Sequence, residues 1–86
     1  MRTLVIIQEV DDVDHWLRSP RRRELFGPVG IAARTFVDSE HSNRVGLVVE
    51  VASMELFEEV MRSPGAAQAM EDDGVRAQTV LILSEG

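Results

Sequence analysis

The second half of this sequence resembles the first half when the chain is laid over itself. Arg18–Pro20 matches Arg62–Pro64, and the two serines give the shift, 63 − 19 = 44 residues. Self-similarity of this kind indicates two copies of one supersecondary unit. In a chain of 86 residues each copy is too short to bury its own apolar face. The repeat therefore predicts one domain, residues 1–86, built from the units 1–43 and 44–86.

Each half has the pattern of a strand, two short helices and a second strand. Runs of Val, Ile and Leu predict the strands, because such side chains pack well on a pleated sheet. A Ser-Pro pair inside each half predicts a second helix start, since Ser caps a helix and Pro fits its first turn. Asp11 or Asp12 and Ser53 are the expected caps of the earlier helices. The predicted strands are Thr3–Val10, Ile31–Asp38, Val45–Ala52 and Val75–Ser84, and the predicted helices are Val13–Arg18, Pro20–Phe26, Met54–Arg62 and Pro64–Asp73.

Two βαβ units with right-handed crossovers give a four-stranded antiparallel sheet in the order 4-1-3-2, with the helices on one face. This is the ferredoxin-like βαββαβ fold of the α+β class. Side chains alternate across a strand, so one set of strand positions must face the helices. The odd-numbered positions are apolar or threonine and are expected to face the helices; they include Val5, Ile7, Val49, Val51, Leu81 and Leu83. The even-numbered positions are expected on the open face; they include Leu4, Ile6, Gln8, Arg34, Phe36, Val48, Glu50, Gln78, Val80 and Ile82.

The even-numbered face carries more apolar surface than a soluble monomer usually leaves in water. We therefore expect a homodimer in which two such faces stack through a two-fold axis. Stacking would place the polar residues of this face in a partly dry interior, where they must pair with each other or meet a ligand.

Arg34 and Glu50 are the charged residues that would enter this interior. If the central hairpin is symmetric about His41, Arg34 lies opposite Val48 and diagonal to Glu50. One interpretation is a structural ion pair inside the dimer. The other is a pair that orients the carboxylate, phenol or enolate of a ligand, with Glu50 as the acid or base and Arg34 as the cation.

His15 is a further candidate base, because histidine titrates near neutral pH. Its position next to Trp16 on a short helix is equally consistent with a solvent-exposed surface residue. The expected ligand contacts are even-numbered strand residues together with Trp16, whose ring can form the wall of a cleft. They are Ile6, Gln8, Trp16, Phe36, Val48 and Gln78.

Composition excludes several kinds of site. With no cysteine and two histidines, the chain has no thiolate metal site and no disulfide. A net charge of −6 disfavours nucleic acid, whose binding depends on a basic surface. No phosphate-binding loop or serine nucleophile motif occurs. Arg18 and the run Arg21–Arg23 form a basic patch that could hold a phosphate or carboxylate, although a solvated helix surface also explains it. We expect no metal, no cofactor and no membrane partner, and a cytoplasmic protein.

The ferredoxin-like half-barrel, its split crossover helices and its mixed open face resemble the dimeric α/β-barrel superfamily. That group includes antibiotic-biosynthesis-type monooxygenases, muconolactone-isomerase-like proteins, small polyketide cyclases and haem-degrading enzymes. The segments Trp16–Pro20 and Met61–Ala67 also look like small members of the group. The resemblance implies a cofactor-free enzyme that oxygenates, cyclises or isomerises a hydrophobic aromatic or polyketide-like molecule through an enolate.

Two departures limit what this resemblance implies. Residues 54–73 contain no histidine that could be an axial haem ligand, and the chain has no tyrosine for the His/Tyr pair of the cyclases. The alternative is a non-catalytic ligand-binding or assembly domain whose open sheet face is only a dimer interface.

Overall fold

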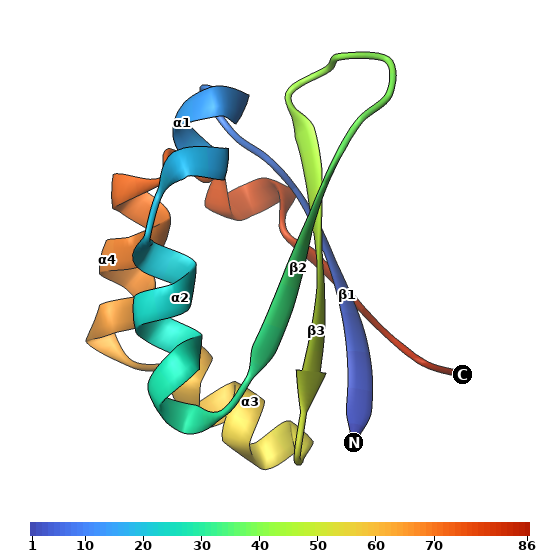
Figure 1. The fold of residues 1–86 in the computed structure, drawn as a ribbon, viewed down its shortest axis with the longest axis vertical. Coiled ribbons are helices and arrows are strands. Elements are labelled where there is room, and N and C mark those ends of the chain that lie inside the picture. Colours follow the sequence, from blue (N-terminus) through green and yellow to red (C-terminus); the bar gives the residue numbers. More distant parts are fainter.

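A four-stranded antiparallel sheet forms one layer of the protein and the helices form the other (Figure 1). The structure is a computed structural model that describes all 86 residues. The sheet order is β2-β3-β1-β4, which is the predicted order read from the opposite edge, and it confirms the ferredoxin-like α+β fold. The elements are β1 (Arg2–Glu9), α1 (Val13–Arg18), α2 (Arg21–Phe26), η1 (Gly27–Val29), β2 (Ala32–Val37), β3 (Arg44–Val51), α3 (Met54–Met61), α4 (Pro64–Asp72), η2 (Ala77–Thr79) and β4 (Leu81–Ser84).

Three of the four α-helices begin at the side-chain caps that the sequence predicts. Asp12 accepts a hydrogen bond from the backbone N–H of His15, Ser53 caps α3, and Ser63 caps α4 with Pro64 in the first turn. At α2 the N-cap position is Pro20, while the Ser19 hydroxyl donates to Asp73 and accepts the backbone N–H of Arg21 (3.2 Å). None of the helices is long and apolar enough to cross a membrane.

The last predicted strand is shorter than expected. Only Leu81–Ser84 pairs with β1, while Val75 forms an isolated bridge and residues 77–79 make the 3-10 turn η2. The Thr79 hydroxyl explains the interruption: it donates to the carbonyl of Arg76 (2.6 Å) and accepts the N–H of Glu9 (2.9 Å). The Thr79 hydroxyl thus accepts the Glu9 N–H in place of a backbone carbonyl of a neighbouring strand. Gln78 consequently lies in a turn and not on the sheet.

The two faces of the sheet differ from the prediction in β1 and β4. The register pairs Leu4 with Val49 and Ile6 with Leu47, so even positions of β1 share a face with odd positions of β3. The prediction of one parity for all strands was therefore wrong. The helix-facing side includes Leu4, Ile6, Gln8 and Ile82, and the open face includes Val5, Ile7, Leu81 and Leu83. In β2 and β3 the predicted parity is confirmed.

The two halves of the repeat are not offset by the same number of residues throughout, so the parity of β1 does not carry over to β3. The N-caps Asp12 and Ser53 are 53 − 12 = 41 residues apart, whereas Ser19 and Ser63 are 63 − 19 = 44 apart. The second half thus holds three more residues between cap and Ser-Pro turn, and α3 is longer than α1 by 8 − 6 = 2 residues. Because side chains alternate along a strand, an odd offset of 41 matches even-numbered positions of β1 with odd-numbered positions of β3. The 44-residue shift aligns the Ser-Pro turns but not β1 with β3.

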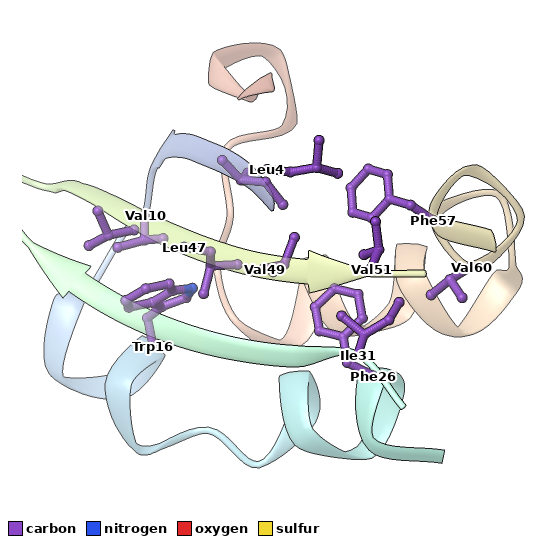
Figure 2. Packing of buried hydrophobic residues seen from close by; sticks show 12 residues of the cluster. Leu4, Val10, Trp16, Phe26, Ile31, Leu47, Val49, Val51, Phe57 and Val60 are labelled. Carbon is purple, nitrogen blue, oxygen red and sulfur yellow. The ribbon is translucent and has the colours of Figure 1, made fainter. Parts of the chain in front are cut away.

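The core lies where the helices cover the two central strands (Figure 2). Trp16 of α1 packs toward one end of β3, and Phe57 of α3 packs toward the other end beside Leu4. Leu4 and Trp16 are completely buried. The edge strand β2 is not covered in this way, since all six of its residues are exposed, including those on the helix-facing side.

Candidate functional site

A pocket of about 50 Å³ lies between the helical layer and the central strands. Its walls are mostly apolar: 11 of the 14 lining residues are hydrophobic. The three polar residues are Gln8 from β1, Arg22 from α2 and Asp73 at the end of α4. This volume is room for a few waters or one small chemical group, and less than the roughly 300–1,000 Å³ of a site for a drug-sized ligand.

Gln8 is the unusual polar residue of this pocket. It is only 6% exposed, yet its amide forms no hydrogen bond with another protein group. No side-chain nitrogen or oxygen that is sealed from solvent lacks a partner, so the Gln8 amide atoms must remain accessible from the pocket. An accessible amide can hydrogen-bond a water or a ligand atom in the pocket, which avoids the roughly 1–3 kcal/mol that a sealed, unpartnered amide would cost.

Arg22 and Asp73 form a buried ion pair in the pocket wall. Arg22 Nη1 donates to Asp73 Oδ2 (3.2 Å), and Arg22 Nη2 donates to the carbonyl of Trp16 (2.6 Å). The Ser19 hydroxyl donates to the other carboxylate oxygen of Asp73. The Arg22 side chain is 13% exposed and that of Asp73 is 3% exposed. A buried pair of this quality needs both partners, because either charge alone would be uncompensated.

The guanidinium of Arg22 is held rigidly. Its central carbon lies 4.1 Å from the centroid of the Trp16 ring, close enough for a cation–π contact. Burial lowers the pKa of Arg22 from its ordinary value, and the Asp73 charge opposes that shift. Arginine remains protonated at physiological pH under such conditions. The pocket therefore has one permanently charged but neutralised pair and one uncharged amide.

Three of the nine predicted site residues line this pocket: Ile6, Gln8 and Trp16. Ile6 and Gln8 lie on the helix-facing side of the sheet and not on the open face where the sequence placed them. The remaining ligand candidate Gln78 is exposed in η2, away from the sheet face where we expected it. The positions of these residues differ from the prediction because the helix-covered face and the register between strands both depend on contacts between distant segments.

Arg34, Phe36, Val48 and Glu50 lie together on the open face. The predicted register is confirmed, because Arg34 pairs with Val48 and Glu50 occupies the diagonal position. No ion pair joins Arg34 to Glu50; the guanidinium carbon of Arg34 instead lies 5.9 Å from the centroid of Phe36. Both charged residues are exposed in the single chain, where water screens their attraction.

His15 lies on the outer surface of α1, where its Nε2 atom is 2.8 Å from the carbonyl oxygen of Asp72. It does not line the pocket. No group of three or more histidine, aspartate or glutamate side chains lies close enough to hold a metal ion.

Sequence reasoning missed Arg22 and Asp73 as pocket residues. Arg22 was placed in a basic run on a solvated helix surface, and Asp73 was expected only as the last residue of the helix Pro64–Asp73. A helical pattern could have identified both. Arg22 precedes Leu25 and Phe26 by three and four positions, and Asp73 follows Ala69 by four, so each lies on the inward stripe of its helix.

Comparison with known proteins supports the fold. No protein-family model and no curated protein matches the sequence. Among solved structures, an antibiotic biosynthesis monooxygenase matches all of this chain and 97% of its own chain, with a TM-score of 0.69 and 14% identity.

Two further solved structures are similar. A candidate antibiotic biosynthesis monooxygenase from Deinococcus radiodurans has a TM-score of 0.60 at 12% identity, with 100% of this chain and 91% of that chain covered. A conserved Bacteroides thetaiotaomicron protein of unknown function, for which an oxidoreductase role is suggested, has a TM-score of 0.59 at 15% identity and covers 98% and 92%. At such identities the likeness establishes a shared fold.

Proposed function

We propose that this protein is a homodimer that binds a small, largely apolar molecule in the pocket between its helices and its sheet. We further propose that it acts on that molecule without a metal or organic cofactor, by oxygenation, cyclisation or isomerisation. The observation that carries the proposal is the Gln8 amide, buried without a protein partner in an apolar pocket. Two similar folds described as monooxygenases support the reaction class.

The chemistry of the pocket limits the kind of ligand. An amide both donates and accepts hydrogen bonds, so Gln8 complements one carbonyl or hydroxyl group. The apolar walls complement a hydrocarbon skeleton, and their low dielectric strengthens the polar contact. An aromatic or polyketide-like molecule with an enolisable carbonyl has these features.

An aromatic or polyketide-like molecule is larger than the pocket of about 50 Å³, so the pocket must widen to bind it. Met61 and Met70, from α3 and α4, belong to its walls. Methionine side chains are flexible and adapt readily to a new shape, so they are the residues that would move.

The open sheet face supports the homodimer. It carries Val5, Ile7, Phe36, Val48, Leu81 and Leu83, and the last two are half exposed in the single chain. Complete burial of one such side chain contributes about 1.5–3 kcal/mol, so several together favour association. Arg34 and Glu50 then become interface residues, and their catalytic role and that of His15 stay predictions.

The small pocket volume favours one alternative, a non-catalytic ligand-binding or assembly domain. An experiment separates the two. Trp16 is the only tryptophan and lines the pocket, so its fluorescence reports binding of 1-naphthol. Oxygen consumption with anthrone, a small enolisable ketone that O₂ oxidises to anthraquinone and water, reports turnover.

Gln8→Leu is expected to weaken 1-naphthol binding at least about tenfold, the effect of roughly 1.4 kcal/mol from one lost hydrogen bond. The matched control is Gln78→Leu, which removes an exposed glutamine outside the pocket. Binding without any protein-dependent oxygen consumption would favour the alternative. No saturable binding, or equal binding by both variants, would reject the proposed site.

A further inference from the structure

Arg22 has hydrogen-bonding capacity that the protein does not use. A guanidinium carries five N–H donors. The fold assigns one to Asp73 and one to the carbonyl of Trp16, and no protein acceptor lies on Nε. The side chain is only 13% exposed and belongs to the pocket wall. Unused donors at this position are available to a molecule in the pocket.

The position of these donors is fixed before any ligand arrives. Two hydrogen bonds and the Trp16 ring hold the guanidinium plane. Asp73 accepts one hydrogen bond on each carboxylate oxygen, from Ser19 and from Arg22, so it acts as the anchor. Donors that are rigid in a poorly solvated site stabilise a negative oxygen more strongly than water-exposed ones do.

The charges around Arg22 decide which anions suit it. Arg22 and Asp73 are the only charged residues that line the pocket, and together they are neutral. Arg21 pairs with Glu24 and Asp72 on the outer surface, and His15 contacts the Asp72 carbonyl there. A carboxylate or phosphate holds its hydration strongly and would lose it without meeting a net opposite charge. A phenolate or enolate spreads its charge over a carbon skeleton, loses less hydration, and can accept hydrogen bonds from the spare donors of Arg22.

From this arrangement we propose that Arg22 selects ligands with a weakly acidic hydroxyl or enol, and that it binds them as the oxyanion. The inference rests on the proposed function, since it requires the pocket to bind an apolar molecule. Gln8 lies in the wall of the same small pocket, so it can contact the same oxygen or its neighbour. Ionisation breaks only the O–H bond, and the proton passes to solvent buffer; no electron is transferred.

The probe for this inference is 4-nitrophenol, whose anion absorbs visible light while the neutral form does not. The experiment measures the midpoint pH of ionisation for free and for protein-bound probe. If the anion binds about tenfold more tightly than the neutral form, the midpoint of the bound probe is about one pH unit lower. We expect at least that shift with the wild-type protein.

The test variant is Arg22→Met combined with Asp73→Asn, because Arg22→Met alone would strand a buried carboxylate. The double change leaves the net charge unaltered and is expected to bring the bound midpoint to the free value or above it. The matched control, Arg23→Met, removes an exposed arginine of the same helix that does not line the pocket, and it should keep the shifted midpoint.

The outcomes distinguish the role of Arg22 from the proposed function on which it rests. A lowered midpoint in the wild type and Arg23→Met, but not in the double variant, supports the role of Arg22. Bound probe with an unshifted midpoint in the wild type, or an equal shift in the double variant, overturns this role and leaves the proposed function standing. No saturable binding of either 4-nitrophenol or 1-naphthol overturns both.

Discussion

The two faces of the sheet are built from similar residues but have different surroundings. On the helix-covered face Leu4 and Val49 are fully buried, and even the polar Gln8 is buried. On the open face Leu81 is 52% exposed and Leu83 is 45% exposed. Apolar side chains on both faces are typical of a sheet that is covered on both sides. The difference shows that this chain covers only one of the two faces of its sheet.

The polar residues differ in the same way. On the covered side Arg22 and Asp73 are buried and paired, and the Gln8 amide faces a pocket. On the open side Arg34 and Glu50 are exposed and form no ion pair with each other. This difference agrees with both proposals, which place ligand binding on the covered face and association on the open face.

The largest expected effect is the loss of the buried indole on the covered face. Trp16→Ala should lower the free energy of unfolding by about 3–5 kcal/mol, because it leaves a cavity in the core. Urea unfolding at two protein concentrations measures this loss, which should be independent of concentration. Leu17→Ala, at a 41% exposed position on the same helix, is the control and should cost less than about 1 kcal/mol. Equal losses would contradict the assignment of the core.

Removal of one buried charge should be nearly as costly. Asp73→Ala leaves Arg22 charged and uncompensated, so a loss of about 3 kcal/mol or more is expected in thermal or urea unfolding. The control on the other face is Glu50→Ala, which should change stability by less than about 1 kcal/mol. If Arg22→Met combined with Asp73→Leu is as unstable as Asp73→Ala, the stranded charge is not the cause of the loss.

Two neighbouring residues of β4 have side chains on opposite faces of the sheet, so substituting each one tests one face separately. Ile82 pairs with Ile6 on the covered side and Leu83 pairs with Val5 on the open side, and their exposures are similar, 41% and 45%. Leu83→Ser should weaken the proposed dimer about tenfold or more, roughly 1.4 kcal/mol, in analytical ultracentrifugation. Ile82→Ser should leave dimerisation unchanged and reduce only folding stability. A monomeric wild-type protein at micromolar concentration would reject the dimer.

A smaller effect is expected at the charged residues of the open face. Arg34 contacts the Phe36 ring at 5.9 Å, an exposed cation–π contact of about 0.5–1 kcal/mol at most. Arg34→Gln should therefore reduce the free energy of unfolding by no more than that amount. A larger loss that grows with protein concentration would show that Arg34 is buried and paired in the dimer.

The β2–β3 loop belongs to neither face and provides a local reference. The Ser42 hydroxyl (2.5 Å) and then the backbone N–H of Glu40 (2.8 Å) donate to Asp38 and lower its pKa. A lowered pKa in the folded state gives stability that is present above the unfolded pKa and lost as the pH falls through the folded one. NMR titration should show Ser42→Ala raising the pKa of Asp38 toward its ordinary value. No change would contradict the role of the hydroxyl.

Much of the fold could be predicted from the sequence because its signals are local. Asp12, Ser53 and Ser63 cap helices where the sequence places them. The register of the β2–β3 hairpin could also be predicted, since a short loop between adjacent strands determines which residues pair. The strand order followed from the handedness of the two crossovers.

The β1–β3 register could not be predicted in this way. Those strands are joined through two helices and a hairpin, so no short loop determines their register, and the 44-residue repeat does not align them. The same cause misplaced Ile6 and Gln8, which the sequence identified as ligand contacts but assigned to the wrong face. Ile6 and Gln8 do line a pocket, but that pocket lies on the helix-facing side of the sheet and not on the open face.

The sequence by itself determined the order of the elements, the strand order and the presence of apolar surface on both sides of the sheet. Propensity, capping and alternation are properties of neighbouring residues, so no folded structure is needed to recognise them. Only the tertiary structure decided which side the helices cover and that Arg22 meets Asp73, 51 residues away. Burial and ion pairing depend on where distant segments pack together. The repeat that divides the chain into halves therefore established the architecture, and the packing of helices on β1 and β3 established the candidate site.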